Sequence, residues 1–269
     1  MKRNSIIAMG ICVLAIIALG CSKTLKDYGF TQKLDNTYAF LKINYESNYS
    51  NNRTVWFKIN NQRVGGPITA RSPFPGGGFN TGGTSTADVI SVTPGSTKLS
   101  VVLLHKIDNG LDSLELYSTN FQLDAGKTYI AHITDTAANT KSVLTQENVA
   151  LPDTNYARFH FLNLMPNVPA VDIYYGTVAT TVADQKSDSL MVSNLGYLKN
   201  SGDIKFKING ANGIWKIRAA GAPRINNTIA SYTSTSVPLS QRVFCGFALG
   251  YSGKTTTAQK PYISFLLVR

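Results

Sequence analysis

The most constraining feature of this chain is a two-residue alternation of apolar and polar side chains that recurs along its length. Successive side chains of a strand point to opposite faces of its sheet, so the alternation predicts strands with one buried and one solvated face. No stretch keeps a helical spacing of apolar residues over a dozen positions. The clearest runs have as their apolar members Val55, Phe57 and Ile59; Val171, Ile173 and Tyr175; and Ile204, Phe206 and Ile208. We therefore expect an all-β protein with antiparallel sheets.

Turn-forming residues separate these runs, as in Thr-Pro-Gly at 93–95, Asp-Asn-Gly at 108–110 and Asn-Gly at 209–210. The 269 residues include 22 Gly, 13 Tyr and 12 Phe, a composition that favours strands and turns over helices. Because 43% of the residues are hydrophobic, the chain can bury a core, which excludes a disordered protein. Many short strands with regular turns predict β-sandwiches.

The chain also repeats itself at a near-constant spacing. The segments YAFLKI from residue 38 and YARFHF from residue 156 both open a strand, 118 residues apart. Later in each repeat, VWFKI from residue 55 matches VDIYY from residue 171, at an offset of 116. We expect two tandem sandwich domains of one fold, 37–155 and 156–269. Each should fold alone, because each holds a full set of strands.

The amino terminus has the features of a secretion signal. Two basic residues precede an uncharged run over 6–20, which is shorter than the roughly 20 apolar residues of a membrane-spanning helix. The run ends at Ala-Leu-Gly-Cys21, which resembles the bacterial lipobox, in which the Cys is acylated and becomes the new terminus. We expect a signal peptide over 1–20 and a polar tether over 21–36 that begins with lipidated Cys21. The alternative is a plain secretory signal with an incidental Cys.

The cysteine count then excludes an intramolecular disulfide in the mature chain. Cys12 leaves with the signal and Cys21 carries lipid, so Cys245 stands alone. Cys245 shares a predicted strand face with Val243 and Phe247, which favours a small buried thiol over a reactive nucleophile.

The second half carries a more specific pattern, with ARFHFLNLMP over 157–166 and PAVDIY over 169–174. Together these segments resemble the opening of domain of unknown function 4397, in which a strand with Arg158 leads through Asn163 into a second strand with Asp172. The resemblance implies immunoglobulin-like sandwiches, often in tandem copies, of a kind common in envelope lipoproteins of the Bacteroidota. It implies no catalytic residues. The first half departs from the pattern and is reached only through the internal repeat.

Sequence signals for catalysis or metal binding are missing. The three His residues, at 105, 132 and 160, have no second His or Cys at ligand spacing, and neither His-Glu-x-x-His nor Cys-x-x-Cys occurs. The Gly-x-Ser-x-Gly turn of many hydrolases is missing too. We expect no catalytic residues, no metal site and no cofactor. A triad assembled from distant positions is the alternative left open.

A Gly-rich loop over 72–83 contains two aromatic residues, Phe74 and Phe79. It lacks the Gly-Lys-Ser/Thr ending that supplies charge in a phosphate-binding loop. We interpret it as a loop at the end of a sandwich, with Phe74 and Phe79 as candidate ligand contacts. Trp56 and Trp215 have two interpretations, as stacking platforms for sugar rings or as packing residues.

Charge is unevenly distributed along the chain, whose net charge is +11. The second half has twelve basic and four acidic residues, whereas the first half has nine of each. Lys205 and Lys207 share one predicted strand face, and Lys216 and Arg218 share another. We expect a basic sheet surface there, which is either a binding site for acidic polymers or a solvated face. Nucleic acid is not an expected partner, since no recognition helix or aromatic RNA motif is present.

These features predict an envelope lipoprotein without enzymatic activity, anchored in the cell outer membrane and facing the cell surface or the periplasm. We expect a binding module for a protein or glycan partner. Acidic glycan, lipopolysaccharide and envelope proteins are the partners that fit this compartment. The alternative is a structural or adhesive accessory subunit of a cell-surface assembly, and an enzyme is the third hypothesis.

Overall fold

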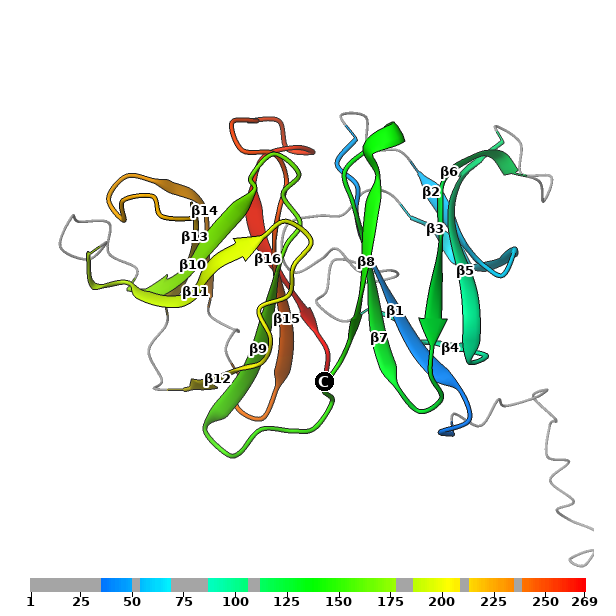
Figure 1. Ribbon diagram of the computed structural model, residues 1–269, viewed down its shortest axis with the longest axis horizontal. Coiled ribbons are helices and arrows are strands. Elements are labelled where there is room, and N and C mark those ends of the chain that lie inside the picture. The colour runs from blue at the N-terminus through cyan, green and yellow to red at the C-terminus, as the bar shows by residue number, and fades with distance from the viewer. Residues whose placement is uncertain are drawn as a thin grey trace, which may run out of the picture. The chain divides into compact units, whose positions relative to one another are not determined.

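The computed structural model describes residues 35–49, 54–68, 87–105, 112–177, 186–208, 213–234 and 239–269. These ranges contain strands β1 to β16, a short 3-10 helix, η1 (Ala137–Asn139), and helical residues at 186–187. The all-β prediction is therefore confirmed (Figure 1). Within these ranges, no helix is long and apolar enough to cross a membrane.

Strands β1 to β8 form two four-stranded sheets that pack as a sandwich. One sheet, β4-β1-β7-β8, contains β1 (Ala39–Glu46), β4 (Ile90–Val92), β7 (Thr128–Thr134) and β8 (Lys141–Gln146). The other, β3-β2-β5-β6, contains β2 (Val55–Ile59), β3 (Gln62–Ile68), β5 (Gly95–Leu104) and β6 (Asp112–Leu123). Because apolar residues alternate along these strands, the facing sides bury one cluster that includes Leu41, Ile43, Phe57, Leu99 and Ile133.

Strands β9 to β16 form a second sandwich. One sheet, β12-β9-β15-β16, contains β9 (Tyr156–Asn163), β12 (Ile204–Lys207), β15 (Val243–Leu249) and β16 (Tyr262–Leu267). The other, β11-β10-β13-β14, contains β10 (Ala170–Gly176), β11 (Ser189–Gly196), β13 (Gly213–Ala219) and β14 (Thr228–Ser234).

The core of the second sandwich is aromatic. The Trp215 ring centroid lies 5.0 Å from that of Phe159 and 5.1 Å from that of Phe161, and all three side chains are fully buried. Such tilted contacts between rings add to the stabilisation from apolar burial. Trp215 is therefore a packing residue, and its interpretation as a sugar-stacking platform is wrong.

The two halves repeat each other strand for strand. Adding eight to each strand number of the first two sheets gives the order of the second two, and each pairing keeps its direction. No sheet mixes described strands from both halves, although 35–269 form one compact unit. The division into folding units at residues 155 and 156 stays a prediction.

One pairing in each half departs from the expected antiparallel sheets. Strand β1 runs parallel to β7, and β9 runs parallel to β15. Parallel neighbours need a long crossover connection, and here the chain passes through the opposite sheet between the two strands. The local alternation of side chains contains no information about this direction.

The outer faces of β1, β7 and β8 pack against those of β9, β15 and β16, and we call this contact the seam. Lys42 Nζ donates to the carbonyl oxygen of Leu267 at 3.0 Å, and Thr134 Oγ1 donates to that of Leu164 at 2.8 Å. Ile130 of β7 belongs to the apolar cluster of the second sandwich. Strands β1, β7, β9 and β15 are consequently buried on both faces.

Cys245 lies on the seam face of β15 and is fully buried. Burial raises the pKa of its thiol well above the usual range, which suppresses the reactive thiolate. The prediction of a buried thiol is confirmed.

The fragment 156–269 should unfold cooperatively when expressed alone, because it contains both sheets of the second sandwich. Without the first half, the seam faces of β9, β15 and β16 lose their cover. We therefore expect its urea midpoint to lie below that of the full chain. Circular dichroism during a urea titration measures both midpoints, and a fragment without a cooperative transition would contradict the prediction.

Candidate functional site

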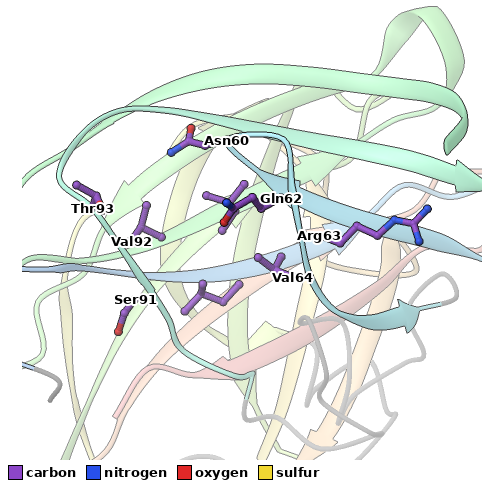
Figure 2. A pocket seen from close by; sticks show the side chains of 9 residues that line it. Asn60, Gln62, Arg63, Val64, Ser91, Val92 and Thr93 are labelled. Carbon is purple, nitrogen blue, oxygen red and sulfur yellow. The ribbon is translucent and has the colours of Figure 1, made fainter. Parts of the chain in front are cut away.

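A pocket of about 190 Å³ lies between the β2–β3 hairpin and β4 (Figure 2). Strands β3 and β4 are the outermost strands of the two sheets of the first sandwich, so the pocket lies where these sheets meet along one side. Its lining residues are Ile59, Asn60, Gln62, Arg63, Val64, Ile90, Ser91, Val92 and Thr93.

The hairpin turn that forms one wall is built by Asn60 and Asn61, whose φ angles are 48° and 68°. Two successive residues with positive φ give a turn that matches the twist of paired strands, and Asn tolerates this conformation better than most residues. Asn60 is also held by β5. Its backbone N–H donates to the carbonyl oxygen of Lys98, and its Oδ1 accepts from the Lys98 N–H, both at 2.9 Å.

The lining combines buried apolar side chains with exposed polar ones. Ile59 and Val92 are buried, whereas Asn60, Gln62 and Thr93 are exposed. In Figure 2, Asn60 and Thr93 lie on the side of the view away from Arg63. Amide and hydroxyl groups both donate and accept hydrogen bonds, which is what sugar hydroxyls require. The pocket is smaller than the sites of drug-sized ligands, so it can hold only a small ligand or one end of a larger one.

Arg63 connects the pocket to the outer face of its sheet. Its guanidinium carbon lies 5.0 Å from the ring centroid of Trp56 on β2, a cation–π contact. Trp56 is half-buried and does not line the pocket. Of its two interpretations, the arrangement therefore favours packing on the sheet face.

The lining residues that the structure describes include no general acid or base. Among them, Arg63 is the one titratable side chain, and a guanidinium stays protonated. In the part of the chain that the structure describes, no group of three or more His, Cys, Asp and Glu could hold a metal ion. The pocket can hold a polar ligand, but it offers no side chain for proton transfer.

The predicted ligand loop over 72–83 lies in the chain between the two strands that border the pocket, β3 and β4. Phe74 and Phe79 lie outside the described residues, and so does Cys21, so all three stay predictions. Sequence reasoning missed Asn60 and Gln62. The available signal was the Asn-Asn pair between two strand-like runs.

The four residues of the predicted basic surface do not form one surface. Lys205 and Lys207 lie on β12 and Lys216 and Arg218 lie on β13, which belong to different sheets. Lys205 is exposed and pairs with Asp153, with 2.6 Å between Nζ and Oδ2. Lys216 and Arg218 are only 6% and 0% exposed, so the prediction of a basic surface is wrong for these two residues.

Asp188, just before β11, covers the basic pair on β13. Lys216 Nζ lies 2.7 Å from Asp188 Oδ1, and Arg218 Nη2 lies 2.6 Å from Asp188 Oδ2. The Arg218 guanidinium also lies 4.3 Å from the Tyr174 ring centroid. Buried charges persist when they are paired in this way. The alternation placed both cations on one strand face, but it could not reveal the carboxylate that covers them.

Asn163 and Asp172, which carry the family resemblance, hold turns in place. Asn163 Nδ2 donates to the carbonyl oxygen of Val168 at 3.0 Å. The Asp172 carboxylate accepts from the backbone N–H groups of Asn194 at 2.8 Å and Gly221 at 3.0 Å. These contacts give both residues a structural role.

Comparison with protein families gives one match. The model described as "Domain of unknown function (DUF4397)" matches residues 77–174. The match runs from the Gly-rich loop into β10 and so crosses both halves, whereas the sequence pattern placed the resemblance mainly in the second half. It supports this domain family over the matched stretch. A search of curated proteins finds no match.

Solved structures give distant similarities. A structure described as α-glucan binding by a streptococcal virulence factor is 8% identical, with a TM-score of 0.25, and the match covers 83% of this chain and 96% of that one. One described as α-glucan recognition by family 41 carbohydrate-binding modules from streptococcal virulence factors is 10% identical, with a TM-score of 0.26 and coverage of 84% and 96%. A leucine-rich repeat protein from Bacteroides thetaiotaomicron is 10% identical, with a TM-score of 0.19 and coverage of 74% and 24%. With TM-scores this low, we infer neither the fold nor the function of this chain from these structures.

Replacing Asp188 by Ala should lower the free energy of unfolding by about 3–5 kcal/mol, because it leaves two buried cations without their counter-charge. Chemical denaturation followed by circular dichroism measures the change. The matched control is Asp153→Ala, which breaks the exposed ion pair with Lys205 and should leave the midpoint nearly unchanged. Equal changes in the free energy of unfolding for the two substitutions would contradict the burial of the Asp188 cluster, which consists of Asp188, Lys216 and Arg218.

Proposed function

We propose that this protein is a non-enzymatic binding module that holds a glycan in the pocket between the β2–β3 hairpin and β4. The observation that carries the proposal is the lining itself, in which exposed amide and hydroxyl groups surround buried apolar side chains. Sugars present hydroxyl groups at their rim and C–H groups on their ring faces, and this lining complements both. None of the described lining residues is an acid or a base, which favours binding over catalysis.

The position of the pocket supports the same proposal. The Gly-rich loop with Phe74 and Phe79 begins after β3 and ends before β4. Loops carried on a rigid sandwich are common binding elements. We propose that this loop supplies further ligand contacts, with its aromatic residues available to stack on sugar rings.

We further propose that the chain is a lipoprotein of the outer membrane, anchored through Cys21. The signal-like segment and its Ala-Leu-Gly-Cys ending motivate this proposal. Two or more acyl chains give stable anchoring, whereas a single chain binds a membrane only marginally. An anchored module would present its pocket to glycans of the envelope or its surroundings.

Glycan binding is tested with Gln62→Ala and Thr93→Ala, which remove exposed polar groups from the lining. Each should weaken binding by about 2- to 10-fold, the worth of one hydrogen bond. A glycan array identifies the ligand, and calorimetry then measures the affinities. Gln122→Ala is the matched control, because Gln122 is exposed on β6, at the opposite edge of the same sheet. Equal affinities for all variants would place the glycan elsewhere, and a protein ligand in place of a glycan would favour the accessory-subunit alternative.

Anchoring is tested with Cys21→Ser in cells supplied with labelled palmitate. The variant should accumulate as a larger precursor without label, because acylation of the Cys precedes cleavage of the signal. Gel mobility and incorporated label are the measurements. A variant that still takes up palmitate would show that the anchor assignment is wrong.

A further inference from the structure

The seam contains a buried chain of polar side chains that the proposed binding site does not use. Asn44 Nδ2 lies 2.9 Å from His132 Nδ1, and His132 Nε2 lies 3.2 Å from Thr145 Oγ1. Thr145 Oγ1 in turn donates to Glu147 Oε1 at 2.6 Å. This series of polar side chains ends at the second sandwich, where Glu147 Oε2 lies 3.4 Å from His160 Nε2.

The Glu147–His160 contact joins the two halves in a fully desolvated place. The side chains are 1% and 5% exposed, and neither Glu147 Oε2 nor His160 Nε2 has a hydrogen-bond partner. A charged carboxylate or imidazolium would be costly here, so burial favours the neutral form of each group. The surrounding titratable and charged groups are Lys42 and Glu46 on β1, His132 on β7, Arg158 on β9, Asp203 before β12 and Cys245 on β15.

We propose that Glu147 and His160 form a neutral, mutually compensating pair that keeps the two sandwiches docked across the mildly acidic to neutral range. The buried position of both side chains and their contact across the seam carry this inference. It does not depend on the proposed glycan site.

The two groups respond to pH with opposite signs. Burial raises the pKa of Glu147 to about 7 from 4.5, so between these values the open seam has lost a proton that the closed seam keeps. Raising the pH through this interval therefore favours opening. Burial lowers the pKa of His160 to about 4 from 6.5, so lowering the pH through that interval favours opening.

The two intervals overlap between pH 4.5 and 6.5, where the effects offset each other. Two further buried groups nearby also shift in opposite directions, because burial lowers the pKa of His132 to about 3 and raises that of Glu46. Replacing either Glu147 or His160 should therefore reveal the titration of the group that remains. Each unmasked change corresponds to about 300-fold in the opening equilibrium, since the pKa of each group moves by 2.5 units at tenfold per unit.

Cys245 provides a probe for opening, because it is fully buried on the seam face of β15. In the full-length chain, N-ethylmaleimide labelling is read by mass spectrometry on the peptide that contains Cys245. Dividing the native rate by the rate for unfolded protein at the same pH removes the ionisation of the thiol itself. Tryptophan fluorescence recorded in parallel shows whether the aromatic core around Trp215 stays folded.

Wild-type protein should show little change in relative labelling between pH 4.5 and 6.5. In Glu147→Gln, labelling should rise as the pH falls from 6.5 to 4, whereas in His160→Gln it should rise as the pH increases from 4.5 to 7. Over these windows each rise should be about 80-fold, because the group is only half titrated at each end of its window and the full 300-fold extends beyond both ends. The double variant should be flat again. Glu115→Gln, at an exposed position on β6, is the matched control and should behave like wild type in this range.

Infrared spectroscopy of the wild type gives a second readout that needs no folded variant. A protonated carboxyl band should be present at pH 5.5 and decline near pH 7, and in folded Glu147→Gln that component should be missing. A wild type without this band would overturn the proposal. Single variants that share one pH dependence, or native Cys245 that labels as fast as unfolded protein, would overturn it as well.

Discussion

Burial of four strands on both faces is the constraint on which the rest of this structure depends. Strands β1, β7, β9 and β15 turn one face to a sandwich core and the other to the seam. A polar side chain on such a strand has no access to water and needs a partner inside the protein. Lys42 finds backbone carbonyl groups near the carboxyl end of the chain, and Asn44 finds His132. The docking of the halves thus relies on specific polar contacts as well as apolar packing.

The Asp188 cluster shows the same requirement on another face. Lys216 and Arg218 are buried on the outer side of β13, and one carboxylate, that of Asp188, pairs with both. Buried ion pairs of this kind add little net stability over apolar packing, but removing one partner is costly. We therefore infer that these ion pairs hold Asp188, directly before β11, against the outer face of β13.

The pocket between the β2–β3 hairpin and β4 differs from both sites because much of its polar lining is exposed. Asn60, Gln62 and Thr93 can be hydrated without a ligand, so a ligand must exchange water contacts for protein contacts. The affinity of such a site depends on how well its walls are held in place. Here the turn at Asn60 is fixed to β5, which pre-organises one wall before any ligand arrives.

The sequence by itself determined the strands, the internal repeat and the apolar cores, because a period of two and its turn residues are local properties. The predicted ligand loop over 72–83 follows β3 and precedes β4 in the chain, and its role stays a prediction. Only the tertiary structure decided whether the polar face of each strand is exposed or buried. Lys205 and Lys216 both follow the same alternation, yet one is exposed and the other is buried beneath Asp188. Alternation shows which side chains share a face, but whether a distant segment covers that face depends on long-range packing. For the same physical reason, the parallel pairs and the titratable contacts of the seam were decided by the fold.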